Sequence, residues 1–237
     1  MLYWLLKHLV AGPLLKSAFR PWVSGAEHVP AKGPVILASN HLSVIDSVFL
    51  PLVIDRRVTF LAKKEYFTGT GAKGWLTKQF FLATGMLPID RSGGAASEAS
   101  LKTGLEVLNA GGALGIYPEG TRSPDAKMYR GRTGIARMIT EMDCKVPVVP
   151  VAMVDTEKVM PIGTTIPRAR RIGIVIGEPI DFSRYAGMPA DRWLLRAITD
   201  EVMTELHALS NQEYRDMYAS SIRAKLDAER LAEKKAS

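Results

Sequence analysis

The sequence predicts an α/β fold: a single domain with a largely parallel or mixed central sheet flanked by helices. After residue 30, short apolar runs alternate with longer stretches of helical periodicity. Several of these runs are continuously apolar, which is typical of strands covered on both faces. At 237 residues and 47% hydrophobic composition, the chain is long enough to bury one large core.

The expected elements follow in chain order. Strands, each a short apolar run, are predicted at residues 34–38, 58–62, 86–89, 113–117, 146–153 and 172–177. Helices, each with apolar residues at helical spacing, are predicted at residues 43–53, 73–83, 95–109 and 133–143. Because the two kinds of element alternate, residues 26–190 are expected to form the α/β core.

Residues 191–237 are expected to form helices packed on that core. Asp191 follows Pro189 as a helix start signal, and Ser210-Asn211 marks a break before a second helix. In this second helix, apolar or aromatic residues recur every four positions, at Tyr214, Tyr218, Ile222 and Leu226. The stripe covers too few heptads for a coiled coil, so a packed helix is predicted.

Residues 1–25 are predicted to form an amphipathic helical segment at a membrane interface. Trp4, Phe19 and Trp22 lie among leucines and basic residues, a combination that suits the interface. Basic residues and Pro13 interrupt this stretch, whereas a spanning helix needs about 18 or more apolar residues. The segment could be one helix or two helices broken near Pro13. The alternative is a helix packed on the protein's own core.

The charge balance favours anionic partners. The chain has 31 Lys and Arg against 24 Asp and Glu, a formal net charge of +7. Nucleic acid is disfavoured because no recognisable nucleic-acid-binding motif accompanies the charge. The remaining candidate partners are phosphorylated small molecules and a membrane surface that contains anionic lipids. The cluster of Arg168, Arg170 and Arg171 suits lipid headgroups, and a solvated turn is an equal alternative. Cys144 is the one cysteine, so no intramolecular disulfide can form.

His41 and Asp46 are the candidate catalytic pair. If the strand at 34–38 ends just before them, His41 lies at the carboxyl edge of the sheet, where open α/β sheets bind ligands. A helix starting near Ser43 would return Asp46 to the imidazole, fixing its tautomer and leaving the other ring nitrogen to act as a base. A compatible alternative is a capping box, with Ser43 as the N-cap. No metal site is predicted, because no ligand spacing links His41 to His8, His28 or His207.

Basic residues follow three predicted strands: Lys63, Arg91 and Arg122. Guanidinium groups suit phosphate because two parallel hydrogen bonds fix its orientation. Gly120 lies in a tight turn that could aim backbone N–H groups and Arg122 at one point. The alternative is that each arginine forms a weak surface ion pair with a neighbouring acid.

Four segments together carry a family resemblance. They are Asn40-His41 with Asp46, the segment 85–91, the segment Tyr-Pro-Glu-Gly-Thr-Arg-Ser at 117–123, and the Val-Pro-Val-Val-Pro run at 146–150. The basic segment 62–65 also matches. On these residues the chain resembles the glycerolipid acyltransferase family typified by bacterial 1-acyl-glycerol-3-phosphate acyltransferases. The likeness covers roughly residues 30–180, and its third segment is the most specific. Tyr117 stands where the family more often has Phe.

The resemblance implies a mechanism without an enzyme nucleophile. His41, oriented by Asp46, would deprotonate the free hydroxyl of the acceptor, which attacks the carbonyl carbon of an acyl thioester. Arg91 and Arg122, with Lys63, would hold the acceptor phosphate.

The remaining residues of the third segment have smaller expected roles. Glu119 and Thr121 would position the Arg122 side chain or the glycerol, and the backbone N–H of Gly120 is a candidate oxyanion donor. Ser43 as a covalent acyl carrier is a minor alternative.

The expected activity is formation of phosphatidic acid from 1-acyl-glycerol 3-phosphate. The alternatives are another acceptor, such as glycerol 3-phosphate or another lysolipid, or a non-catalytic binder of anionic lipid. The donor would be acyl-CoA or an acyl carrier protein thioester, used as a co-substrate with no cofactor. The protein is expected to be peripheral, on the cytoplasmic face of the cell membrane. An apolar stretch is left as core, as acyl-groove wall or as membrane-facing patch: Trp75, Leu76, Phe80, Phe81 and Leu82.

Overall fold

The structure is a computed structural model that describes residues 6–90 and 95–236. Within these residues, seven strands form the central sheet in the order β1-β8-β7-β2-β5-β3-β4. Neighbouring strands are parallel except β7 and β8, which are antiparallel. The strands are β1 Trp22–Ser24, β2 Val35–Ser39, β3 Val58–Lys63, β4 Leu87–Ile89, β5 Ala113–Ile116, β7 Val148–Val154 and β8 Gly173–Ile176. The predicted α/β class with a mixed, largely parallel sheet is confirmed.

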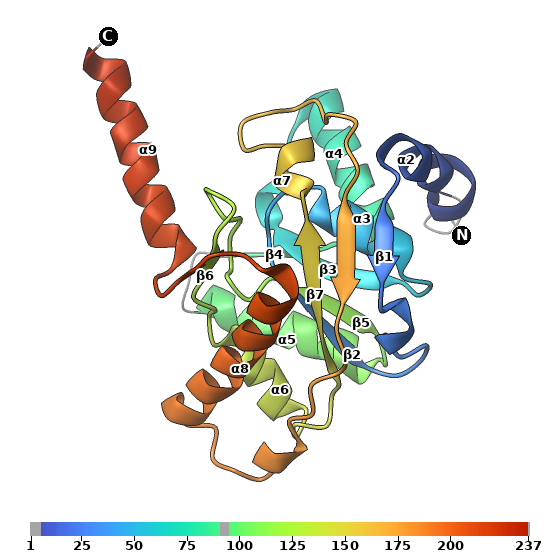
Figure 1. The fold of residues 1–237 in the computed structure, drawn as a ribbon, viewed down its shortest axis with the longest axis vertical. Coiled ribbons are helices and arrows are strands. Elements are labelled where there is room, and N and C mark those ends of the chain that lie inside the picture. Colours follow the sequence, from blue (N-terminus) through green and yellow to red (C-terminus); the bar gives the residue numbers. More distant parts are fainter. Residues whose placement is uncertain (1–5, 91–94, 237) are drawn as a thin grey trace.

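Helices cover both faces of the sheet (Figure 1). Their bounds are α2 Ala11–Phe19, α3 Asp46–Val53, α4 Gly71–Ala83, α5 Ala95–Asn109, α6 Gly134–Glu141, α7 Thr156–Val159, α8 Arg192–Ser210 and α9 Ala219–Ala236. Shorter helical turns are η1 Leu6–Val10, η2 Ala26–His28, η3 Lys64–Tyr66 and η4 Ser183–Tyr185. Side chains of α2 and α3 join one core cluster, and those of α5, α6 and α8 join the other.

The continuous apolar runs of the sequence are the buried central strands. Every residue of β2 is buried, because β2 lies between β5 and β7 and is covered on both faces. The register pairs Val35 with Ala113 and Ile36 with Val148. The carboxyl ends of the parallel strands β2, β3 and β5 therefore meet at one edge of the sheet.

The N-terminal segment departs from the expectation at its end. The described helical part stops at Phe19, and Trp22–Ser24 forms the edge strand β1, parallel to β8. Phe19 is buried in the core, whereas Leu9 and Leu14 are exposed by 61% and 70%. The segment is therefore partly packed on the protein and partly exposed. No helix among the described residues is long and apolar enough to span a membrane.

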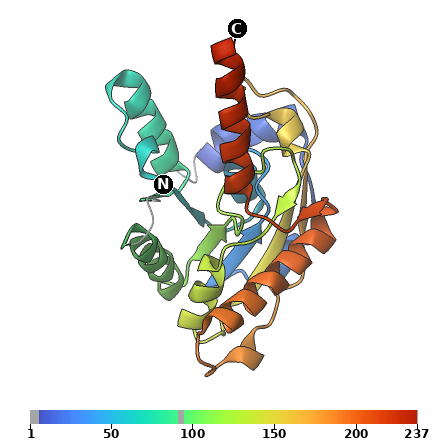
Figure 2. The same cartoon turned by 90° about the vertical axis from the view of Figure 1, so that its left-hand side faces the viewer.

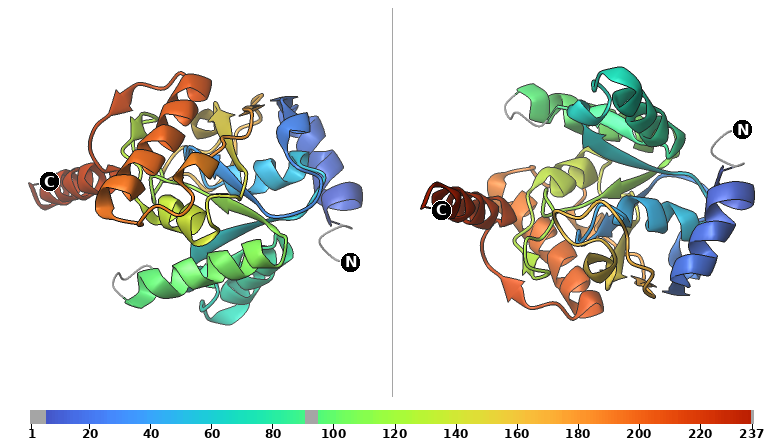
Figure 3. Two further views of the ribbon diagram at one scale, coloured as in Figure 1. Left: turned by 90° about the horizontal axis from the view of Figure 1, so that it is seen from below. Right: turned by 90° about the horizontal axis from the view of Figure 1, so that it is seen from above.

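The C-terminal segment packs on the core through its first helix, as expected, but departs from the expectation after that helix. Helix α8 begins after Asp191, as predicted, and buries Ile198, Val202 and Leu206. Tyr214, however, lies in strand β9 (Tyr214–Arg215), which pairs with β6 (Met128–Tyr129). Helix α9 then projects away from the core (Figures 1 and 2). In both views of Figure 3, α2 and α9 lie at opposite ends of the molecule.

Candidate active site

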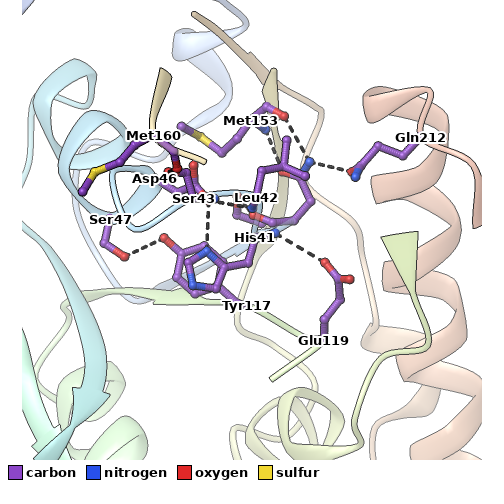
Figure 4. A network of polar contacts seen from close by, with 12 residues as sticks. His41, Leu42, Ser43, Asp46, Ser47, Tyr117, Glu119, Met153, Met160 and Gln212 are labelled. Carbon is purple, nitrogen blue, oxygen red and sulfur yellow. Dashed lines mark hydrogen bonds and ion pairs between the residues drawn. The ribbon is translucent and has the colours of Figure 1, made fainter. Parts of the chain in front are cut away.

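The candidate site begins at the carboxyl end of β2, where Asn40 is completely buried. Its Oδ1 accepts a hydrogen bond from the Met153 N–H at 2.7 Å, and its Nδ2 donates to the Met153 carbonyl at 3.0 Å. The same Nδ2 donates to Gln212 Oε1 at 2.7 Å (Figure 4). Asn40 thus joins β2 to β7 and to the C-terminal segment, which fixes the backbone immediately before His41.

His41 and Asp46 are in direct contact. His41 Nδ1 lies 2.9 Å from Asp46 Oδ2, and the same oxygen accepts the backbone N–H groups of Leu42 and Ser43, each at 2.8 Å. The Asp46 side chain is completely buried, and the imidazole is 16% exposed. Asp46 Oδ2 therefore both closes the turn and orients the His41 ring. Because Nδ1 faces the carboxylate, acid–base chemistry by this ring would involve Nε2.

The predicted capping box is only half present. Helix α3 begins at Asp46 with Ile45 at its N-cap position, so Ser43 is not the N-cap. Asp46 does accept the Ser43 backbone N–H, but the Ser43 hydroxyl donates to the Met160 carbonyl at 2.9 Å. Since Ser43 is also completely buried, the structure gives no support to it as an acyl carrier.

Tyr117 lies under the imidazole of His41. The two rings are stacked, with centroids 3.8 Å apart and planes 10° apart. The Tyr117 hydroxyl and Ser47 Oγ are 2.7 Å apart, which fixes the phenol (Figure 4). Burial raises the pKa of Tyr117 well above its usual value, so the ring stays neutral. In the sequence Tyr117 stands out only as a departure from the family's Phe, and no local signal indicates the stacking.

Glu119 has a different role from the predicted one. Its Oε1 accepts the His41 backbone N–H at 3.3 Å, and its Oε2 accepts the Tyr129 backbone N–H at 3.0 Å. The side chain is 1% exposed, and burial raises its pKa to about 8 despite these two bonds. Glu119 does not line the cavity described below. It holds the backbone of His41 in place rather than Arg122 or the glycerol.

Gly120 also differs from its expected role. Its backbone N–H donates to the Tyr117 carbonyl at 3.0 Å, so it closes the turn rather than pointing at a substrate. The φ of Gly120 is +77°, a conformation that side chains with a Cβ rarely adopt. The turn therefore explains the glycine, and the structure does not support it as an oxyanion donor.

A cavity of about 440 Å³ joins the predicted residues at the carboxyl edge of the sheet. Of those residues, His41, Lys63, Thr121 and Arg122 line it. Arg91 lies outside the described residues. Burial lowers the pKa of the Arg122 guanidinium, and the nearby Arg223 of α9 acts in the same direction. Arg223, which was not predicted as a site residue, lines the cavity as well.

Most of the remaining lining residues are apolar. They come from α3 and the turn before it, from β3, from α4 and from the turn before β4, and include Val44, Val48, Leu61, Phe81 and Met86. The volume is typical of ligand sites. A molecule with an anionic head and an apolar tail fits a lining that contains both cationic and apolar side chains.

In α4, one residue of the apolar stretch fits an acyl-groove wall and three fit a membrane-facing patch. Phe81 lines the cavity and stacks on Tyr66, with ring centroids 4.7 Å apart. Trp75, Leu76 and Leu82 are instead exposed by 59%, 61% and 42%. The Phe80 side chain lies outside the described part of the chain.

The comparisons with known proteins agree with this geometry. The Acyltransferase family model matches residues 20–154. The chain is 28% identical over 192 residues to a 1-acyl-sn-glycerol-3-phosphate acyltransferase of Bacillus subtilis, covering 80% of this chain and 88% of that protein. It is 27% identical over 164 residues to a chloroplastic 1-acyl-sn-glycerol-3-phosphate acyltransferase of Arabidopsis thaliana, covering 68% of this chain and 44% of that longer protein. Among solved structures, the 1-acyl-sn-glycerophosphate acyltransferase PlsC of Thermotoga maritima shares the fold, with a TM-score of 0.59 and 23% identity over 84% of this chain and 79% of that chain.

Proposed function

The chain belongs to the acyltransferase family, and we propose that it transfers a fatty acyl group from an acyl thioester to the free hydroxyl of 1-acyl-glycerol 3-phosphate, giving phosphatidic acid. The Bacillus subtilis relative, of which the chain covers 88%, carries the name of this activity. The observation that supports the proposal best is the position of His41. Its carboxylate-bound imidazole lines the same cavity as Lys63 and Arg122.

The reaction begins with proton transfer to His41. Asp46 holds Nδ1 at 2.9 Å, so Nε2 is the nitrogen that accepts the proton of the acceptor hydroxyl. The hydroxyl oxygen forms a bond to the thioester carbonyl carbon, and the carbon–sulfur bond then breaks. The departing thiolate takes the proton back from the imidazolium. No enzyme nucleophile and no cofactor are needed in this sequence; acyl-CoA or an acyl carrier protein thioester is the co-substrate.

The cationic and the apolar lining residues position different parts of the substrate. Arg122 and Lys63 attract the phosphate, which orients the glycerol hydroxyl toward the imidazole. Thr121 lines the cavity beside them. The apolar lining, with Phe81 and Met86, accommodates the start of an acyl chain. Arg91 retains its proposed role as a phosphate ligand from the family resemblance.

The exposed apolar side chains suit a peripheral membrane protein. Leu9 and Leu14 in the N-terminal segment and Trp75 and Leu76 on α4 are each more than half exposed. We expect them to enter the interface of a membrane with anionic lipids, on its cytoplasmic face. The net charge of +7 adds electrostatic attraction.

Vesicle flotation tests this placement. The double variant Trp75→Ser/Leu76→Ser should reduce the bound fraction on vesicles of anionic phospholipid. The matched control is Met188→Ser, a 53% exposed apolar residue far along the chain, after η4. If the double variant and the Met188→Ser control bind the vesicles equally, α4 is not part of the membrane contact.

The activity is tested with purified protein, a panel of lysolipids and glycerol 3-phosphate, and both thioester donors. Wild-type protein should acylate 1-acyl-glycerol 3-phosphate, and His41→Ala should abolish turnover. His207→Ala is the matched control, because His207 is exposed on α8 and outside the cavity. Transfer by His41→Ala at the wild-type rate would refute the proposed base. Transfer to a different acceptor would change the substrate and leave the chemistry intact.

A further inference from the structure

The segment between α8 and α9 returns to the neighbourhood of the candidate site. Helix α8 ends at Ser210, and Asn211, with a φ of +53°, turns the chain. Strand β9 then pairs with β6, Met128 opposite Tyr214. This segment, residues 211–218, therefore runs beside the loop that follows β5 and carries Arg122.

Hydrogen bonds attach this segment to both sides of the site. Gln212 accepts from Asn40, next to His41, and its Nε2 donates to the Ala126 carbonyl at 2.7 Å. Backbone bonds of 2.9 Å and 3.0 Å join Met128 to Glu213 and Arg130 to Met217. The segment is thus held in one position relative to the catalytic pair.

The first turn of α9 is held in the same way. Ala219 is completely buried, and the Ser220 hydroxyl accepts a hydrogen bond from Arg132 at 2.9 Å. The guanidinium groups of Arg130 and Arg132 lie 5.9 Å and 5.2 Å from the centre of the Tyr218 ring. Arg223 comes four residues after Ala219 and so lies on the same face of the helix. Its side chain is therefore directed toward the site, although α9 as a whole projects away (Figure 2).

Arg223 shares the cavity with Arg122. Its Nη1 lies 3.4 Å from Thr121 Oγ1, and its charge is one of the causes that lower the pKa of Arg122. Two guanidinium groups in a partly desolvated cavity repel each other. A dianion bound between them attracts both groups, and these attractions outweigh the repulsion. Lys63 adds a third positive charge to the same lining.

We propose that Arg223 is a substrate-binding residue, which together with Arg122 holds a phosphate group in this cavity. The inference rests on the proposed acyltransferase function and extends it to the C-terminal helix, outside the segment that the family model matches. On this inference, the attachment of residues 211–220 places the Arg223 guanidinium beside the phosphate subsite. The phosphate can belong to the acceptor or to the carrier of the thioester, both of which are phosphate esters.

Steady-state kinetics with three variants distinguish these sources. Arg223→Ala should raise the KM of one substrate about tenfold, equivalent to about 1.4 kcal/mol of binding, with kcat within about threefold of wild type. Arg223→Lys should restore part of that loss, because a point charge remains without the bidentate fork. Lys225→Ala is the matched control, since Lys225 is exposed on the same helix.

A rise in acceptor KM assigns Arg223 to the acceptor phosphate, and a rise in thioester KM alone assigns it to the carrier. If neither KM changes more than in Lys225→Ala, the inference is overturned. Failure of the proposed function looks different, because the wild type and the Lys225→Ala control would then both be inactive.

Inorganic phosphate provides a test that does not need turnover. Phosphate should raise the melting temperature of the wild type and of Lys225→Ala, and raise it less in Arg223→Ala. Equal protection of all three proteins by phosphate would also overturn the inference. A comparison of melting temperatures without phosphate shows whether Arg223→Ala is folded.

Discussion

Replacing Asp46 by Asn should reduce turnover by about 30- to 150-fold while leaving the affinity for the acceptor nearly unchanged. Asp46 Oδ2 accepts three N–H donors, from the His41 ring and from the backbones of Leu42 and Ser43. Only the amide oxygen of Asn can replace it there. The amide nitrogen must then take the place of Oδ1, which accepts no hydrogen bond from the residues that the structure describes. The substitution therefore keeps the ring orientation and removes mainly the charge.

The magnitude follows from the imidazolium that forms during proton transfer. Opposite unit charges about 4 Å apart attract by about 4 kcal/mol at an effective dielectric constant of about 20. The imidazole is partly exposed, so we take about 2–3 kcal/mol as the loss in the transition state. Each ~1.4 kcal/mol corresponds to about a tenfold change in rate, which gives the predicted range. The fold should persist, because losing a buried charge offsets the cost of about 1–3 kcal/mol for one buried amide donor without an acceptor.

The assay measures thiol release from an acyl thioester at varied acceptor concentration. The matched control is Asp55→Asn, at an exposed residue beyond the other end of α3, and it should behave as wild type. A kcat for Asp46→Asn within threefold of the control would show that the carboxylate charge does not assist His41. A large rise in acceptor KM without a fall in kcat would show instead that Asp46 acts on substrate binding.

Three further outcomes are expected. Arg122→Ala should raise acceptor KM at least tenfold and thioester KM much less, because its guanidinium lines the cavity where the phosphate is proposed to bind. Glu119→Gln should become more stable relative to wild type as the pH rises from 5 to 8, as measured by urea unfolding. The pKa of Glu119 is about 8 in the folded protein, against about 4.5 ordinarily. Between these values the folded state keeps a proton that the unfolded state loses. The contribution of Glu119 to the free energy of unfolding of the wild type therefore falls by about 1.4 kcal/mol per pH unit over that interval. Asn40→Ala should lower the melting temperature by about 6–12 °C, corresponding to about 3 kcal/mol, because it leaves the buried Met153 backbone and Gln212 without their partner.

Each of these expectations has a contrary result. Equal effects of Arg122→Ala on both KM values would contradict its assignment to the acceptor phosphate. A constant stability difference between Glu119→Gln and wild type across the pH range would show that Glu119 does not keep its proton in the folded state. For Asn40, the control is Asn109→Ala at the exposed end of α5. A similar melting temperature for both variants would show that the bonds of Asn40 contribute little.

Part of the site could be predicted because it depends on neighbours in sequence. The chain places His41 after a buried strand and Asp46 about one turn later. Lys63 is the last residue of β3, and Arg122 lies in the loop after β5. Parallel strands bring their carboxyl ends to one edge, so these four residues converge for a topological reason. The roles of individual residues in the loop after β5 could not be predicted from the sequence. Whether Glu119 faces a substrate or a backbone N–H depends on the packing of Tyr129, ten residues on.

The sequence by itself determined the α/β class, the sheet-edge position of the catalytic pair and the helix start at Asp191, because periodicity and capping act within a few residues of one another. Only the tertiary structure decided that Tyr117 stacks on His41, that Gln212 reaches Asn40 across 172 positions, and that Arg223 enters the cavity. The physical reason is that such contacts depend on how whole elements pack. The local sequence around a residue does not specify which distant surface that residue contacts.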